Sequence, residues 1–155
     1  MKTPSQTVGP YYVIGLVRRD DSYLVEHNHP GSVRLIGTLF DGQGTPIADG
    51  MIEIWEGERW ARSGTDSEGR FSFTVAKPSP RPGETPRFDV YVHARGLLRH
   101  QLTRIYFPDE PNETDSVFGP LSDDERATLV ADAEDGALRF DIRMQGDRAT
   151  VFFEH

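Results

Sequence analysis

The sequence has 155 residues, no cysteine and a formal net charge of −8. This length suits one domain with one core, and the missing thiols exclude disulfides, zinc–thiolate sites, iron–sulfur clusters and a cysteine nucleophile. The acidic balance argues against nucleic-acid binding, which needs a basic face. Neither a membrane-spanning apolar run nor a signal peptide is visible, so we expect a cytoplasmic protein without a membrane partner.

The first thirty residues show no strong hydrophobic periodicity. We expect residues 1–30 to form an extended N-terminal arm and residues 31–155 to form the folded domain. Aromatic side chains in the arm and in the C-terminal tail, namely Tyr11, Tyr12, Phe152 and Phe153, are expected to be buried against a partner chain, because obligate interfaces are large and apolar.

The domain is predicted to consist mainly of strands. Apolar and polar residues alternate in several segments that are separated by turn signals such as Asp41–Gly44 and Asp66–Gly69. We expect about seven strands, at residues 33–40, 51–55, 71–75, 89–94, 101–106, 139–144 and 149–153. Short strands with frequent turns are typical of an antiparallel sandwich, and the fold class is therefore predicted to be all-β, a single β-sandwich.

One short helix is predicted. Ser122 and Glu125 have the spacing of a capping box, which satisfies free amides at a helix start. The helix is expected to run to residue 132 or 133, with Ala127, Val130 and Ala131 facing the sheet. Two proline-rich stretches, residues 77–86 and 107–121, are expected to be loops.

The histidines do not form an obvious catalytic or metal centre. His27 and His29 lie in a loop signal without an apparent third ligand. His93 and His100 flank a glycine-containing bend and could approach one another, but surface positions near a hairpin are the favoured interpretation. A metal site that uses His27, His29 and either Asp89 or His93 stays open as an alternative.

Several motifs resemble chains of the protocatechuate 3,4-dioxygenase family, which are intradiol ring-cleaving dioxygenases. The segment TPSQTVGPY at residues 3–11 resembles the family's opening T-P-x-Q-T-x-G-P-Y/F. The matches continue, in the family's order, at residues 35–44, 52–55, 66–73, 75–78, 94–96, 103–107, 139–146 and 150–153. The resemblance covers nearly the whole chain, and it implies the intradiol dioxygenase (transthyretin-like) sandwich with one short helix and an N-terminal arm.

The resemblance also implies an iron-free chain. The family pairs alpha and beta chains, and its catalytic chains hold ferric iron with two tyrosines and two histidines, ligands that suit this hard ion. The comparable positions here are Arg59 or Trp60, then Arg81, Arg87 and Asp89. Two arginines would repel a trivalent cation. The resemblance therefore implies an alpha chain without metal ligands or catalytic residues, beside a homologous beta chain that binds the iron.

The resemblance further places substrate-pocket residues on Thr7, Gly9, Pro10, Tyr11 and Arg95. A permanent guanidinium suits a catechol-type aromatic carboxylate, which would meet O2 between the two chains. For Arg95 a salt bridge at the surface or interface is an equal alternative. For the whole chain the alternative is a transthyretin-like binding module without a catalytic partner.

Overall fold

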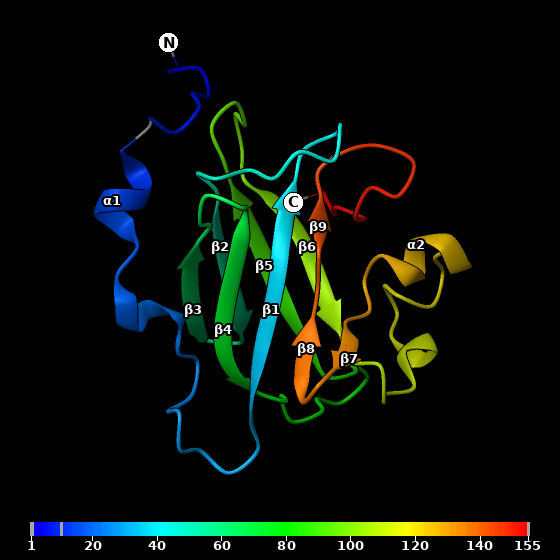
Figure 1. Ribbon diagram of the computed structural model, residues 1–155. Coiled ribbons are helices and arrows are strands. Elements are labelled where there is room, and N and C mark those ends of the chain that lie inside the picture. The colour runs from blue at the N-terminus through cyan, green and yellow to red at the C-terminus, as the bar shows by residue number, and fades with distance from the viewer. Residues whose placement is uncertain (1, 10, 155) are drawn as a thin grey trace.

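The computed structural model describes residues 2–9 and 11–154, which fold as two β-sheets with an N-terminal arm on one side (Figure 1). The first sheet has the order β4-β1-β8-β7, and β9 also pairs with β1. Pairing of β1 with β8 and with β9 is parallel, and its pairing with β4 is antiparallel. Its strands are β1 (Ser32–Phe40), β4 (Arg70–Ala76), β7 (Asp132–Glu134), β8 (Ala137–Arg139) and β9 (Ile142–Arg143).

The second sheet is antiparallel throughout and has the order β3-β2-β5-β6. Alternation aims one side of each strand at the core: Ile52 and Ile54 are buried on β2, and Val90 and Val92 are buried on β5. Its strands are β2 (Met51–Glu56), β3 (Arg59–Gly64), β5 (Arg87–His93) and β6 (Gln101–Tyr106).

The two inner faces form one hydrophobic core. Leu35 and Phe73 of the first sheet belong to the same buried cluster as Ile54, Val90 and Ile105 of the second. Burial of such side chains contributes about 1.5–3 kcal/mol each. The predicted all-β sandwich is therefore confirmed. Among the described residues, no helix is long and apolar enough to cross a membrane.

Three strand predictions were wrong. Strand β3 was missed because it buries only the small side chains of Ala61 and Ser63. The segment 139–144 is split into β8 and β9, because the Thr38 amide donates to the Asp141 side chain (3.0 Å) instead of a backbone carbonyl. The segment 149–153 forms no strand, only a bridge from Phe153 to Leu102, since the Val151 amide donates to a side chain, the Thr128 hydroxyl.

The helix α2 (Asp123–Ala127) is shorter than predicted, although its capping box at Ser122 and Glu125 is confirmed. It ends early because the next residues pair with β6: the Tyr106 amide donates to the Leu129 carbonyl, and the Ala131 amide donates to the Tyr106 carbonyl. Residues 132–134 then form β7. Of the positions expected to face the sheet, Ala131 is buried, whereas Ala127 is exposed.

The arm contains a short helix, α1 (Tyr12–Leu16), and a 3-10 turn, η1 (Arg19–Ser22), beside β3 and β4 (Figure 1). Gly64 of β3 allows α1 to approach, since a side chain there would lie 3.2 Å from Val13. A second 3-10 turn, η2 (Asn112–Thr114), lies within the predicted loop at residues 107–121.

Candidate functional site

The N-terminal arm is held at three points. The Gly96 amide donates to the Thr7 hydroxyl (2.8 Å). The Tyr12 hydroxyl donates to the Asp49 carbonyl (2.5 Å) and lies 3.1 Å from the His93 carbonyl, and Arg62 donates to the Leu16 carbonyl (2.7 Å). The arm therefore has a defined position on the second sheet.

Three of the five expected pocket residues come together at this arm. Thr7 contacts the backbone next to Arg95, and Arg95 forms an ion pair with Asp49, the same residue whose carbonyl accepts from Tyr12. Tyr11 directly precedes Tyr12 and is 77% exposed, so its ring faces away from this chain's own core.

The remaining two expected pocket residues lie on the same segment. The Gly9 carbonyl accepts from the Tyr12 amide (3.3 Å), and no atom would crowd a side chain at Gly9. Pro10 lies outside the described residues. The Arg95 side chain is 58% exposed even in its ion pair, which leaves the guanidinium accessible to a second anionic group.

Two contacts of this site had no signal in the sequence. Burial, followed by the nearby Asp49 carboxylate, raises the pKa of Tyr12 to about 12, so its hydroxyl stays a neutral donor. Asp49 lies in the loop before β2, and nothing in the local pattern indicates that it would meet Arg95. The contacts of Tyr12 and of Arg95 with Asp49 both depend on segments that are distant in sequence coming together at one end of the second sheet.

Three of the four positions that the resemblance assigns to metal ligands line one small cleft on the outer side of the second sheet. Arg81, Arg87 and Asp89 surround a space of about 20 Å³, room for about one water molecule. Trp60 stands apart: it is 42% exposed and stacks on Trp55 at a centroid distance of 6.0 Å.

Charged groups fill this cleft. The Arg87 guanidinium lies 3.1 Å from Glu84, 3.2 Å from Asp115 and 3.6 Å from Asp89. Asp89 also pairs with Arg104 at 3.1 Å. Burial lowers the pKa of Arg87, but the neighbouring carboxylates, Asp89 foremost, raise it by more, so the pKa lies above its usual value.

This donor set does not suit a metal ion. Guanidinium groups only donate hydrogen bonds and stay protonated, so Arg87 supplies a fixed positive charge where a metal would need ligand lone pairs. Asp115 has a side chain only 2% exposed, and it is already used by the Val117 and Phe118 amides and the Tyr106 hydroxyl. The cleft is therefore a closed ion-pair cluster.

Arg104 and Asp115 in this cluster were not identified from the sequence. The register of β5 and β6 places Arg104 directly opposite Asp89, so a correct hairpin alignment would have predicted that pair. Asp115 could not have been found in this way, since it lies in the long loop after β6.

The histidines make no alternative metal centre among the described residues, where no group of three or more histidine, aspartate or glutamate side chains could hold an ion. His27 and His29 are exposed in the loop before β1. The favoured surface interpretation of His93 and His100 was wrong for His93, which is half-buried, and their rings approach to 5.4 Å. His93 also lies 3.7 Å from Glu53 of the neighbouring strand.

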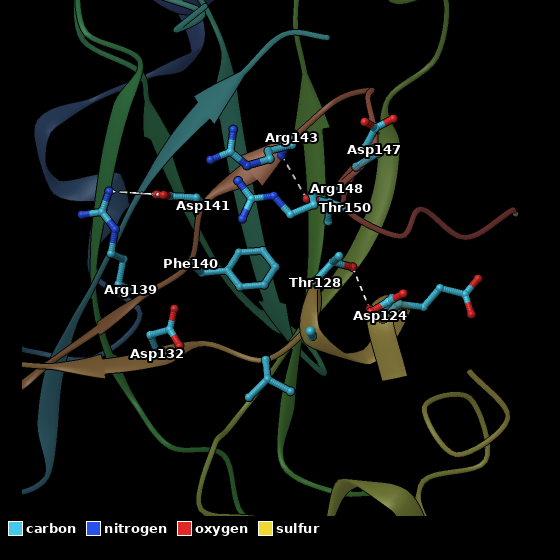
Figure 2. A pocket seen from close by; sticks show the side chains of 14 residues that line it. Asp124, Thr128, Asp132, Arg139, Phe140, Asp141, Arg143, Asp147, Arg148 and Thr150 are labelled. Carbon is cyan, nitrogen blue, oxygen red and sulfur yellow. Dashed lines mark hydrogen bonds and ion pairs between the residues drawn. The ribbon is translucent and has the colours of Figure 1, made fainter. Parts of the chain in front are cut away.

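A mixed-charge pocket of about 540 Å³ lies elsewhere, between α2, β8, β9 and the 146–150 turn (Figure 2). Arg143 and Arg148 point into it above Phe140 in this view. Arg139 also lines it, together with five carboxylates, Asp124, Glu125, Asp132, Asp141 and Asp147, so carboxylates outnumber arginines.

Known proteins resemble this chain over its full length. It is 36% identical to the protocatechuate 3,4-dioxygenase alpha chain of Burkholderia cepacia, covering 99% of this chain and 97% of the relative. It is 31% identical to the alpha chain of the same name from Pseudomonas putida, covering 99% and 96%. The first alignment spans 191 positions, so the relative contains insertions that this chain of 155 residues lacks.

Solved structures show the same fold. The dioxygenase domain of a dioxygenase–carbohydrate-binding fusion protein from Streptomyces sp. SirexAA-E has a TM-score of 0.66 and 24% identity, covering 93% of this chain and 98% of that one. Catechol 1,2-dioxygenase from Acinetobacter sp. ADP1 has a TM-score of 0.59 and 18% identity, covering 78% and 55%. No protein-family model matches the chain.

Proposed function

Because the chain belongs to the family of protocatechuate 3,4-dioxygenase alpha chains, we propose that it is the iron-free subunit of an intradiol ring-cleaving dioxygenase. The complex would cleave protocatechuate between its two hydroxyl-bearing carbons, with O2, to 3-carboxy-cis,cis-muconate. The rival interpretation as a transthyretin-like binding module is not favoured, since its relatives are dioxygenase chains.

The observation that carries this assignment to the iron-free role is the ion-pair cluster around Arg87. A guanidinium held by three carboxylates stands at a position that the family resemblance assigns to a metal ligand. The name alpha chain implies a second kind of chain, and the ferric iron would belong to that homologous beta chain. When bound there, the ion would act as a Lewis acid toward the catecholate.

This chain would contribute walls of the substrate pocket. Residues 1–30 would form the arm that reaches the interface, and residues 31–155 the sandwich that supports it. Thr7, Gly9, Pro10 and Tyr11 would cover the partner's iron side, and the 77% exposed Tyr11 ring would be buried there. Arg95 would place its accessible guanidinium near the substrate carboxylate, where charge-assisted hydrogen bonds are strong.

The tail aromatics, which were expected from the sequence to be buried by a partner, already contact their own chain. Phe152 packs against the main core of its own chain, and Phe153 lies under the Arg104 guanidinium at 5.3 Å. Tyr12 is likewise turned toward its own backbone. The large exposed apolar side chains of the described part of the arm are Tyr11, Ile14, Leu16 and Tyr23. These would be the ones that a partner covers.

Co-expression with the homologous beta chain tests the proposal. We expect a stable complex that consumes O2 with protocatechuate, and we expect iron and the visible tyrosinate band only when the partner is present. Stoichiometric iron with that band in the isolated chain would contradict the iron-free role. A stable monomer that ignores its beta chain would contradict the subunit assignment.

A further inference from the structure

An open groove of about 990 Å³ separates the N-terminal arm from the outer face of the first sheet. Its lining residues come mainly from the arm and from strands β1, β3 and β4, elements that lie beside one another in Figure 1. Val13 and Val17 of the arm form one wall, and Ile36 and Phe40 of β1 contribute an apolar floor. We call this feature the arginine groove, for the arginines that line it: Arg18, Arg19, Arg34, Arg62, Arg70 and Arg139.

The charge of this groove is opposite to that of the chain. Six arginines and two carboxylates, Asp66 and Glu68, line it, whereas the whole chain has a net charge of −8. Asp66 is engaged within its own turn, where it accepts from the Glu68 and Arg70 amides. Glu68 pairs with Arg70 at 2.7 Å. The groove therefore concentrates positive charge on an acidic protein.

Half of these arginines lack an anionic partner. Arg62 pairs with Glu53 at 2.5 Å and Arg139 pairs with Asp141 at 3.1 Å. By contrast, the side chains of three arginines make no hydrogen bond or ion pair with any residue that the structure describes, namely Arg18, Arg19 and Arg34. They come from both sides of the groove, two from the arm and one from β1.

We propose that the arginine groove binds an extended acidic segment of a partner polypeptide. Guanidinium forks match carboxylates in a bidentate geometry. In an extended segment, alternate side chains point to opposite sides, so apolar residues can contact Ile36 and Phe40 while acidic ones reach the arginines on the rim. The groove is open along its length, unlike the concave sites that bury most of a small molecule.

A polypeptide fits this groove better than a nucleic acid does. A nucleic acid carries a dense line of charge that would extend past the groove onto the rest of a protein whose net charge is negative. A short peptide with a few carboxylates feels mainly the charges within a Debye length of about 8–10 Å. The inference does not rest on the proposed oxygenase role, because the groove and the Arg87 cleft share no lining residue.

Fluorescence anisotropy with the full chain tests the inference. The probe is a short fluorescein-labelled peptide in which glutamates alternate with leucines, and the control probe has glutamine in place of glutamate. We expect saturable binding of the acidic probe alone, weakened as salt is raised. Arg19→Gln and Arg34→Gln should each weaken binding about threefold to fivefold, equivalent to up to about 1 kcal/mol for an exposed pair.

Arg99→Gln is the matched control, because Arg99 is exposed and lies outside the groove. The Arg99→Gln variant should bind the acidic probe with the same affinity as the unmodified chain. Near-UV circular dichroism should show that all variants keep their fold. Equal binding of the glutamine probe, or equal weakening by Arg99→Gln, would overturn the inference. Binding of a labelled oligonucleotide as tightly as the acidic peptide would also overturn the inference.

Discussion

The Tyr12 hydroxyl donates a hydrogen bond of 2.5 Å to the backbone carbonyl of Asp49. The side chain of the same Asp49 forms an ion pair with Arg95. One loop residue therefore holds both the arm that presents Tyr11 and the arginine expected to meet the substrate carboxylate. The position of the arm and the position of the guanidinium are coupled through this residue.

The first prediction concerns the arm. Tyr12→Phe removes a hydroxyl that holds the arm, and a typical hydrogen bond contributes about 1 kcal/mol. We expect amide exchange of residues 5–16 to accelerate about fivefold, because local opening becomes easier. Hydrogen–deuterium exchange followed by mass spectrometry measures this. Tyr23→Phe is the control, since the Tyr23 side chain is 46% exposed. Unchanged exchange in Tyr12→Phe would show that other contacts hold the arm.

A second prediction separates substrate recognition from assembly. In the purified complex, Arg95→Ala should lower kcat/KM for protocatechuate about tenfold to a hundredfold, because a desolvated charge-assisted hydrogen bond contributes about 1.5–3 kcal/mol. Plain catechol lacks the carboxylate and should be affected little. Arg99→Ala changes a neighbouring exposed arginine and should leave both values unchanged. An equal loss for both substrates would mean that Arg95 only holds the chains together.

The third prediction concerns the ion-pair cluster. Arg87→Gln leaves the carboxylate of Asp115, whose side chain is 2% exposed, without its cation. Breaking a buried pair in this way lowers the free energy of unfolding by about 3–5 kcal/mol. Because amide donors remain on Asp115, we expect a loss of about 3 kcal/mol. Urea unfolding measures it. Arg59→Gln is the control, because it removes an exposed ion pair with Glu56 and should lower the free energy of unfolding by less than about 1 kcal/mol. Equal losses in the two variants would show that the Arg87 ion pairs do not behave as buried ones.

The fourth prediction is a pH dependence. The neighbouring His93 imidazole and the Arg62 guanidinium lower the pKa of Glu53 from 4.5 to about 2. A carboxyl with a depressed folded-state pKa stabilises the fold above its unfolded pKa, and this stabilisation disappears as pH falls from 4.5 through 2. The Glu53 carboxylate therefore contributes at most about 3 kcal/mol to the free energy of unfolding near neutral pH.

Glu53→Gln tests this dependence. The variant should be less stable than the unmodified chain near neutral pH, and the difference should shrink as the pH falls below 4.5. Urea titrations at several pH values measure it. Glu58→Gln, at an exposed position of the same hairpin, should reproduce the unmodified pH profile. A stability difference that stays constant across the acid range would contradict the role assigned to the Glu53 carboxylate.

The sequence alone was sufficient for the fold class and the main strands. Strands β1, β2, β4, β5 and β6 were predicted to within two residues at each end. Several of them alternate large apolar side chains with polar ones, and β1 is an apolar run that ends at a turn signal. The capping box at Ser122 was equally local, since its two side chains are three positions apart. Local patterns of this kind are fixed by neighbours along the chain, so they can be read without a structure.

Only the tertiary structure decided the rest, because the interactions concerned join residues far apart in sequence. Helix α2 ends early through the pairing of Leu129 with Tyr106, and the predicted strand at 139–144 is split by the bond from Thr38 to Asp141. The ion pair of Arg95 with Asp49 likewise joins two loops. The sequence shows which residue types are present, but only the pairing of the strands and the course of the loops determine which charges meet.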